Sequence, residues 1–442
     1  MESGVIKSII SSFTFSFYLI WWIILPLVLF FVFKDVWFFY IRTLFIRKIK
    51  WVVLEIKVPR NILKTPKAME QVFASIYASY SFGMSIWDRI WDGKVEPYFS
   101  FELVGNEKGI FFYARIPDDK RNLLESAIYS QFPDAEIEET EDYVETLPEV
   151  LPNKTYDIWG TDLVFVREYP YPIKTYLKFE EDIDERRIDP ISSITEVMSK
   201  LKDGEHLWMQ YLVSPTGSPS GKEITKEGKE LVESLVKGKK PKKPAGKMSQ
   251  WIDGMLEFLK NLISGFWKYP EWSKKGEEKE NGKEFVDLAK MTKGVRDIVE
   301  GIENKVSKLS FNTVIRFVYI DRRDSFSPMN VSATFGFFQQ FSTQDMNSLK
   351  PGSTKTLYNN IWARLFPFWK KFMLNYKKRR VYEWYRTRRF GKYNKIREED
   401  FPILCTEELA TLYHFPIEMV EAPSLRRLSS KKGEPPVGLP LK

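Results

Sequence analysis

The sequence predicts an α+β protein in which a single N-terminal transmembrane helix precedes two ferredoxin-like (split βαβ) units, the second with a long helical insertion. Three observations predict this. An uncharged apolar run occupies 13–33, the order strand–helix–strand–strand–helix–strand follows twice, and residues 214–308 interrupt the second occurrence. We therefore expect an N-terminus outside the cytoplasm at 1–12, a membrane helix at 13–33, a basic juxtamembrane segment at 34–50, units at 51–147 and 148–357, a basic aromatic segment at 358–400 and a tail at 401–442.

The apolar run from Phe13 to Phe33 is long enough, as a helix, to cross a hydrocarbon core of about 30 Å. More Lys and Arg residues follow it than precede it. The positive-inside rule then predicts a single-pass protein of the inner (cytoplasmic) membrane, with the N-terminus outside and the body in the cytoplasm. A cleaved signal peptide is disfavoured, because the run is too long and bulky residues follow it.

The first unit is predicted from alternating strands and capped helices. Its strands are expected at Trp51–Val58, Tyr98–Val104, Ile110–Ile116 and Ala135–Val144, the last acidic and at an edge. Its helices are expected after Thr65-Pro66 and from Asp118 to Tyr129.

The second unit repeats this order. Strands are expected at Asp162–Arg167, His206–Val213, Leu309–Ile320 and, weakly, Ser348–Leu357, with helices at Pro190–Leu201 and Met329–Phe341. In the insertion, Gln250–Trp267 has an apolar side at helical spacing. That helix either packs on the body or lies on a lipid surface.

The rarity of certain residue types limits the chemistry. The 442-residue chain has one cysteine, Cys405, and two histidines, His206 and His414. Neither a zinc ligand cluster nor Ser-His-Asp or Cys-His catalysis is expected, and no intramolecular disulfide can form. We therefore expect a protein that is not an enzyme and has no catalytic residues, metal or cofactor. The net charge of +8 favours anionic partners, whether lipid or nucleic acid.

A basic stretch interleaved with aromatic residues runs from Arg364 to Arg397, and only Glu383 opposes its charge. This composition suits a solvated or protein-facing helix, an anionic membrane surface, or single-stranded nucleic acid such as DNA. The residues expected to bind an anionic surface are Lys377, Lys378, Arg379, Arg380, Arg386, Arg388 and Arg389.

The C-terminal tail carries a resemblance. Phe401–Pro416 reads FPILCTEELATLYHFP, and APSLRR and KKGEPPVGLP follow it. These boxes resemble the segment just ahead of the motor in conjugative DNA-transfer ATPases of the type IV secretion class, which are HerA/FtsK-like. The resemblance implies a docking or linker surface for a partner, with Thr406, Glu407, Glu408, Leu409, Leu412, His414, Phe415 and Pro416 as its residues.

The chain contains no Gly-x-x-x-x-Gly-Lys-Ser/Thr loop, so the ATPase activity of these relatives is not expected here. The leading hypothesis is a non-enzymatic, membrane-anchored adaptor of a type IV secretion-like DNA-transfer system that holds or recruits a P-loop ATPase in trans. The alternative is a membrane-tethered nucleic-acid-binding protein that uses residues 364–397. A third is a lipid-surface scaffold that uses Gln250–Trp267. The expected partners are thus the lipid bilayer, the ATPase or DNA, and homo-oligomerisation is left open.

Overall fold

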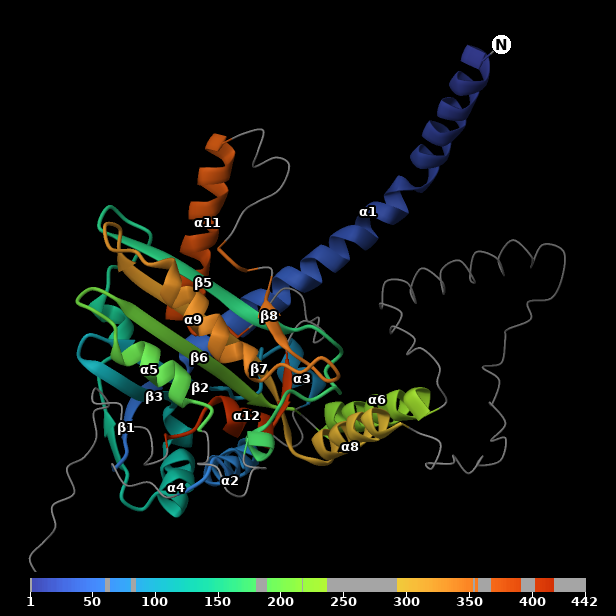
Figure 1. The fold of residues 1–442 in the computed structure, drawn as a ribbon. Coiled ribbons are helices and arrows are strands. Elements are labelled where there is room, and N and C mark those ends of the chain that lie inside the picture. The colour runs from blue at the N-terminus through green and yellow to red at the C-terminus, as the bar shows by residue number, and fades with distance from the viewer. Residues whose placement is uncertain are drawn as a thin grey trace, which may run out of the picture. The chain divides into compact units, whose positions relative to one another are not determined.

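In a computed structural model of the chain, the described residues include nine strands that form one antiparallel sheet in the order β4-β1-β3-β2-β6-β7-β5-β8, with β9 paired to β7 (Figure 1). The structure describes residues 2–59, 64–80, 85–179, 189–216, 218–236, 292–352, 354–356, 367–390 and 402–416, and only part of the side chains before residue 29. The strands are β1 (Trp51–Lys57), β2 (Phe99–Asn106), β3 (Gly109–Pro117), β4 (Glu136–Glu139), β5 (Tyr156–Phe165), β6 (His206–Pro215), β7 (Ser310–Arg322), β8 (Leu349–Pro351) and β9 (Ile403–Cys405).

The helices divide between two compact units. The sheet unit (Met1–Tyr169, Ile173–Ser220 and Lys308–Lys442) contains α1 (Glu2–Lys48), α2 (Lys67–Ile76), α3 (Ile86–Ile90), α4 (Arg121–Gln131), α5 (Ser192–Ser199), α9 (Pro328–Gln339), α11 (Pro367–Arg386) and α12 (Thr406–Leu412). The helical unit (Pro170–Pro172 and Gly221–Ser307) contains most of α6 (Ser218–Val236) and all of α8 (Lys293–Ser307). In it, Leu231 of α6 and Ile302 of α8 share a small apolar core.

The two faces of the sheet differ because successive side chains of a strand point to opposite sides. One face carries an apolar core, which includes Leu54, Phe101, Met209 and Phe317 and is covered by α2, α4, α5, α9 and α12 (Figure 1). The opposite face carries a second core, to which the C-terminal half of α11 contributes Val381, Tyr382 and Tyr385. We call this second side the α11 face.

The prediction of two ferredoxin-like units is wrong, because the strands form one continuous sheet. Strand β2 pairs with β6 from Phe99↔Val213 to Gly105↔Leu207, which joins the two predicted units edge to edge. Both strands are buried along almost their whole length, so each requires a neighbour on both sides. The chain is therefore α+β with a large antiparallel sheet.

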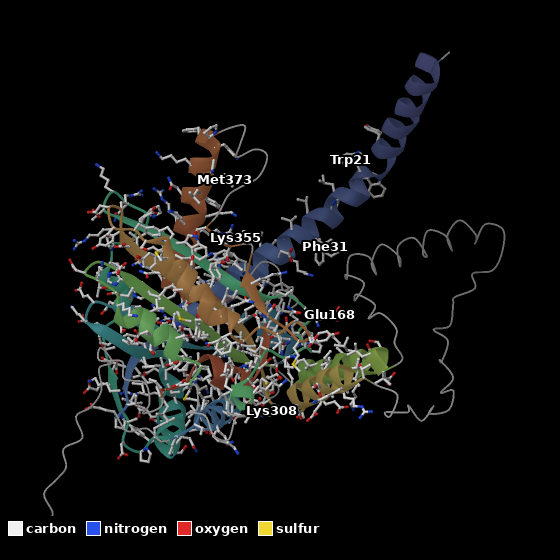
Figure 2. All side chains as sticks on the ribbon, viewed as in Figure 1. Trp21, Phe31, Glu168, Lys308, Lys355 and Met373 are labelled. Atoms are coloured by element: carbon white, nitrogen blue, oxygen red, sulfur yellow. The ribbon has the colours of Figure 1, made fainter. Side chains whose placement is uncertain are left out.

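The prediction of a transmembrane helix, and with it the inner-membrane localisation, is also wrong: among the helices that the structure describes, none is both long and apolar enough to cross a membrane. The apolar run does not form a separate segment, because it belongs to a single helix, α1, that continues to Lys48 through charged positions such as Lys34, Asp35 and Arg42. Figure 2 shows Trp21 and Phe31 along this helix.

The C-terminal part of α1 is fixed to the sheet unit near α3. The indole nitrogen of Trp37 donates a hydrogen bond to the carbonyl of Ile90 at 2.9 Å, and its ring meets Trp91 edge-on. Gly93 has φ +65°, and a Cβ there would lie 2.5 Å from the backbone of Ile41. Only glycine fits that approach, so α1 enters β1 from a defined direction.

Candidate functional site

A row of four polar side chains crosses the middle of the α11 face. Cross-strand pairing aligns Glu102 of β2 with Gln210 of β6, Gln210 with Arg316 of β7, and Arg316 with Asp162 of β5. The register of the four strands alone places these side chains next to one another. We call these four residues the polar row.

Hydrogen bonds join the members of the polar row. The amide nitrogen of Gln210 donates to Glu102 Oε1 at 3.0 Å, and Arg316 Nη1 donates to Gln210 Oε1 at 3.1 Å. Arg316 also forms an ion pair with Asp162 through its Nε. Glu102, Gln210 and Arg316 are all buried, so these bonds replace the water that polar groups lose on burial.

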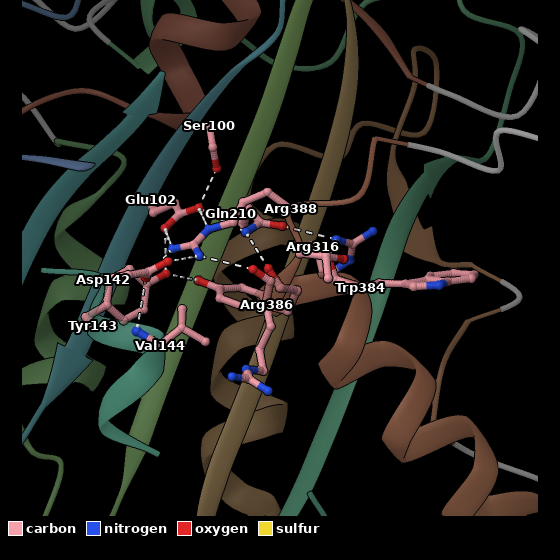
Figure 3. Close-up of polar contacts among 12 residues, drawn as sticks. Ser100, Glu102, Asp142, Tyr143, Val144, Gln210, Arg316, Trp384, Arg386 and Arg388 are labelled. Carbon is pink, nitrogen blue, oxygen red and sulfur yellow. Dashed lines mark hydrogen bonds and ion pairs between the residues drawn. The ribbon is translucent and has the colours of Figure 1, made fainter. Parts of the chain in front are cut away.

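Arg388, which follows α11, binds Glu102 at one end of the polar row (Figure 3). Its Nε and Nη2 donate to the two carboxylate oxygens of Glu102, each at 3.0 Å, and its Nη2 also donates to Asp142 Oδ1 at 2.7 Å. Tyr143 donates its hydroxyl proton to Glu102 Oε2 at 2.7 Å, so the 2.7 Å contact between Tyr143 and Tyr385 is donated by Tyr385. The backbone of Arg388 has φ +46°, a strained conformation for a residue with a side chain.

The environment fixes the charge of each group. Burial alone would raise the pKa of Glu102, but the charge and hydrogen bonds of Arg388 outweigh burial, so this pKa lies below its ordinary value. Burial opposes the charge of Arg388, yet Glu102 raises the Arg388 pKa well above its usual range. Burial and the charge of Glu102 raise the pKa of Tyr143 and Tyr385 well above the ordinary value. None of these four groups titrates near neutral pH. The arrangement therefore suits a structural role, in which the side chains fix one another in place, better than proton transfer.

The polar row and Arg388, which we call the buried network, hold the C-terminal end of α11. Arg316 donates to the carbonyls of Trp384 at 2.8 Å and Arg389 at 3.4 Å, and Gln210 donates to that of Tyr385 at 3.2 Å. The last carbonyls of a helix have no partner within the helix and carry partial negative charge. Buried donors from the sheet therefore cap α11 and fix its end to the α11 face.

The first half of α11 carries little of this packing. Residues 367–372 are exposed, as are Tyr376, Arg379 and Arg380, whereas Val381, Tyr382, Trp384 and Tyr385 are buried. Figure 1 shows α11 extending away from the sheet, and Met373 marks its outer part in Figure 2. We call residues 367–380 the arm.

The predicted anion-binding residues differ in their surroundings. Lys378 pairs with Asp157 at 2.7 Å, Arg386 donates to the carbonyl of Glu149 at 2.9 Å, and Arg388 forms an ion pair with Glu102. Arg379 and Arg380 are exposed, Lys377 and Arg389 are half-buried, and the guanidinium of Arg380 lies 4.4 Å from the ring centre of Trp384. The remaining ends of the predicted stretch, 364–366 and 391–397, lie outside the described residues.

Two exposed cations of the arm, Lys370 and Lys371, were absent from the predicted site. Among the residues that the structure describes, no carboxylate pairs with Lys370, Lys371, Arg379 or Arg380. Within the same residues, no group of three or more His, Cys, Asp or Glu side chains could hold a metal ion.

The predicted docking residues are buried instead of facing a partner: Thr406, Glu407, Glu408, Leu409, Leu412, His414, Phe415 and Pro416. Leu409, Leu412 and Phe415 belong to the apolar core under α2 and α4. Glu408 accepts hydrogen bonds from the backbone nitrogens of Cys405 and Ile173, at 3.0 and 2.9 Å.

Two further polar contacts fix this box, residues 402–416, to the rest of the sheet unit. Glu407 pairs with Lys308, which also pairs with Glu70 of α2. The imidazole Nε2 of His414 lies 2.7 Å from Asp189 Oδ1, with both side chains buried. The box is thus the last described element of the sheet unit, and the rest of the tail, residues 417–442, lies outside the described residues.

A family model matches residues 47–427. The chain therefore belongs to the DUF8128 family, a domain of unknown function. The match spans the whole sheet, the polar row, the arm and the buried box, so these are parts of the DUF8128 domain. No curated protein matches the chain. The match to this domain of unknown function gives no support to the link with secretion and conjugation that the resemblance of the tail implied.

Proposed function

We propose that this DUF8128 protein is a binding protein, not an enzyme, and that the arm contacts nucleic acid. The observation that carries the proposal is the exposed surface of the arm, where Lys370, Lys371, Arg379 and Arg380 accompany a row of aromatic rings. Cations that have no carboxylate partner within the described residues are available to phosphates, and phosphate contacts supply most of the affinity for nucleic acids. The net charge of +8 adds long-range attraction.

The buried network supports this proposal because it gives the arm a fixed base. Arg316, Arg388 and Gln210 hold the C-terminal end of α11 through hydrogen bonds from buried side chains to its carbonyls. A contact surface that is already ordered loses less conformational entropy when it binds. Two buried arginines in one network are costly unless every donor is satisfied, which favours a positioning role for them.

The test is binding of the full chain to a short labelled oligonucleotide, followed by fluorescence anisotropy between about 50 and 200 mM salt. Lys370, Lys371, Arg379 and Arg380 are changed together to Gln. The expected result is weaker binding and a salt dependence reduced by about 0.7 per lost phosphate contact on a single strand, thus by about 3 in the log–log slope.

The matched control changes three exposed lysines elsewhere on the sheet unit, Lys108, Lys350 and Lys355, to Gln. This control lowers the net charge by nearly as much without touching the arm, so it should preserve most of the affinity. If both variants bind like the unchanged protein, or if both lose affinity equally, the arm is not the contact.

Recruitment of a P-loop ATPase in trans stays a separate proposal. The burial of 406–416 leaves this box without a surface for such a partner in the folded sheet unit. A pull-down of a P-loop ATPase that survives deletion of residues 417–442 would contradict the tail as its docking segment.

A further inference from the structure

The aromatic rings of the arm lie on the side of α11 that faces away from the sheet. Phe368, Phe372 and Tyr376 repeat at every fourth position, and Trp369 lies beside them, so they share one side of the helix. Their exposed fractions are 83%, 55%, 50% and 48%, in the order Phe368, Phe372, Tyr376 and Trp369. We call these four residues the ring stripe.

The two arginines lie at the base of the ring stripe. Arg379 and Arg380 follow Tyr376 by three and four positions, which places them beside its side of the helix. The guanidinium of Arg380 is held 4.4 Å from the ring centre of Trp384. A guanidinium packed on an aromatic ring keeps its edge N–H groups free, and that edge matches the geometry of a phosphate.

Exposed rings discriminate between forms of nucleic acid. In a duplex the base faces are stacked inside the helix, and a protein meets phosphates and groove edges. Unpaired bases offer free faces, and stacking on an aromatic side chain adds affinity without requiring a particular sequence. Trp369 and Phe372 are tilted by 34° with centroids 5.7 Å apart, so they are not stacked flat on each other.

We propose that the arm selects single-stranded over duplex nucleic acid, with unpaired bases stacked on Phe368, Trp369, Phe372 and Tyr376 and phosphates bound by Arg379 and Arg380. This inference rests on the proposed nucleic-acid function and adds the class of strand. The cations alone would serve either form, whereas the ring stripe contributes only where bases are unpaired.

The test uses Phe368→Leu combined with Phe372→Leu. Leucine keeps an apolar side chain and a high helix propensity but has no flat ring, and both positions are exposed, so the variant should fold. Stacking on two bases predicts single-strand affinity lower by at least about tenfold. Duplex affinity and the salt dependence should not change.

The control variant is Trp87→Leu, which removes an equally exposed ring from α3 and should leave both affinities unchanged. Vesicles containing phosphatidylserine are the third probe, because rings with cations also suit a lipid surface. If the ring variant keeps its single-strand affinity, or loses vesicle binding instead, the strand preference is overturned. In that case the Gln variant at Lys370, Lys371, Arg379 and Arg380 still decides separately whether the arm binds nucleic acid.

Discussion

Arg388 and Glu102 lie 286 positions apart in the sequence and form a buried bidentate ion pair, with both donor–acceptor distances at 3.0 Å. Glu102 belongs to the centre of the sheet, and Arg388 directly follows α11. Both side chains are almost inaccessible to solvent. The pair therefore connects the position of the exposed arm to the most buried part of the sheet.

Removing one member of this pair should destabilise the fold strongly. We expect Arg388→Gln to lower the free energy of unfolding by about 3–5 kcal/mol, because it leaves Glu102 charged and buried without its partner. Urea unfolding monitored by circular dichroism measures this loss.

The matched control is Arg121→Gln, which breaks pairs with Glu125 and Glu139 at the surface. This change should cost less than about 1 kcal/mol, because solvent screens exposed ion pairs. Similar losses of unfolding free energy for the two variants would mean that the buried Arg388–Glu102 pair stabilises the fold no more than a surface ion pair does.

Acid should act on the fold through His206. Burial beside Trp208 lowers the pKa of His206 from 6.5 to about 4, and the charge of Asp203 opposes this only in part. Because the folded pKa lies below the unfolded one, protonation favours the unfolded chain. The stability that neutral His206 contributes is therefore complete above pH 6.5 and is lost as the pH falls through about 4, by about 3 kcal/mol.

Replacing His206 with Gln isolates this contribution from that of the carboxylates. The difference in unfolding free energy between the two proteins, measured at several pH values, should change between pH 6.5 and about 4 and be constant above pH 6.5. A difference that is constant through the acid range would show that His206 titrates equally in both states.

Truncating a side chain of the buried box, residues 402–416, should destabilise the fold as truncation in a hydrophobic core does. Leu409 is fully enclosed under α2, so Leu409→Ala is expected to cost about 2–5 kcal/mol of unfolding free energy. Leu177, which is 47% exposed, provides the matched control, and Leu177→Ala should cost much less. An equally small loss at both positions, measured in urea, would indicate that the box is not packed in solution.

The strands could be predicted from sequence wherever alternation is strong. Trp51–Lys57 and His206–Pro215 lie close to the segments expected from their β-branched and aromatic residues. The pairing of β2 with β6 could not be predicted, because register between distant strands depends on non-local contacts. The polar row could not be recognised in the sequence for the same reason, because Glu102 or Arg316 alone resembles an isolated polar residue in an apolar strand.

The burial of residues 402–416 is difficult to predict from sequence because two adjacent carboxylates normally lie at the surface. Here Glu408 satisfies backbone nitrogens and Glu407 binds Lys308, which permits their burial. The apolar residues around them, Leu409, Leu412 and Phe415, were the signal for a core helix. In the basic stretch, composition could not separate cations with partners from free ones, since the partner Asp157 lies in a distant strand.

Two neighbouring cations of α11 provide the last prediction, because the structure gives them opposite roles. Lys378 forms a 2.7 Å ion pair with Asp157 and has little exposure, whereas Arg379 is exposed. We expect Arg379→Gln to reduce the salt dependence of oligonucleotide binding by about 0.7 in slope, since one phosphate contact is lost. Lys378→Gln should leave that slope unchanged and instead lower the unfolding free energy, because it leaves the half-buried Asp157 without this partner. Fluorescence anisotropy and urea unfolding on both variants separate the two effects, and an equal change in slope would show that Lys378 contacts phosphate as Arg379 does.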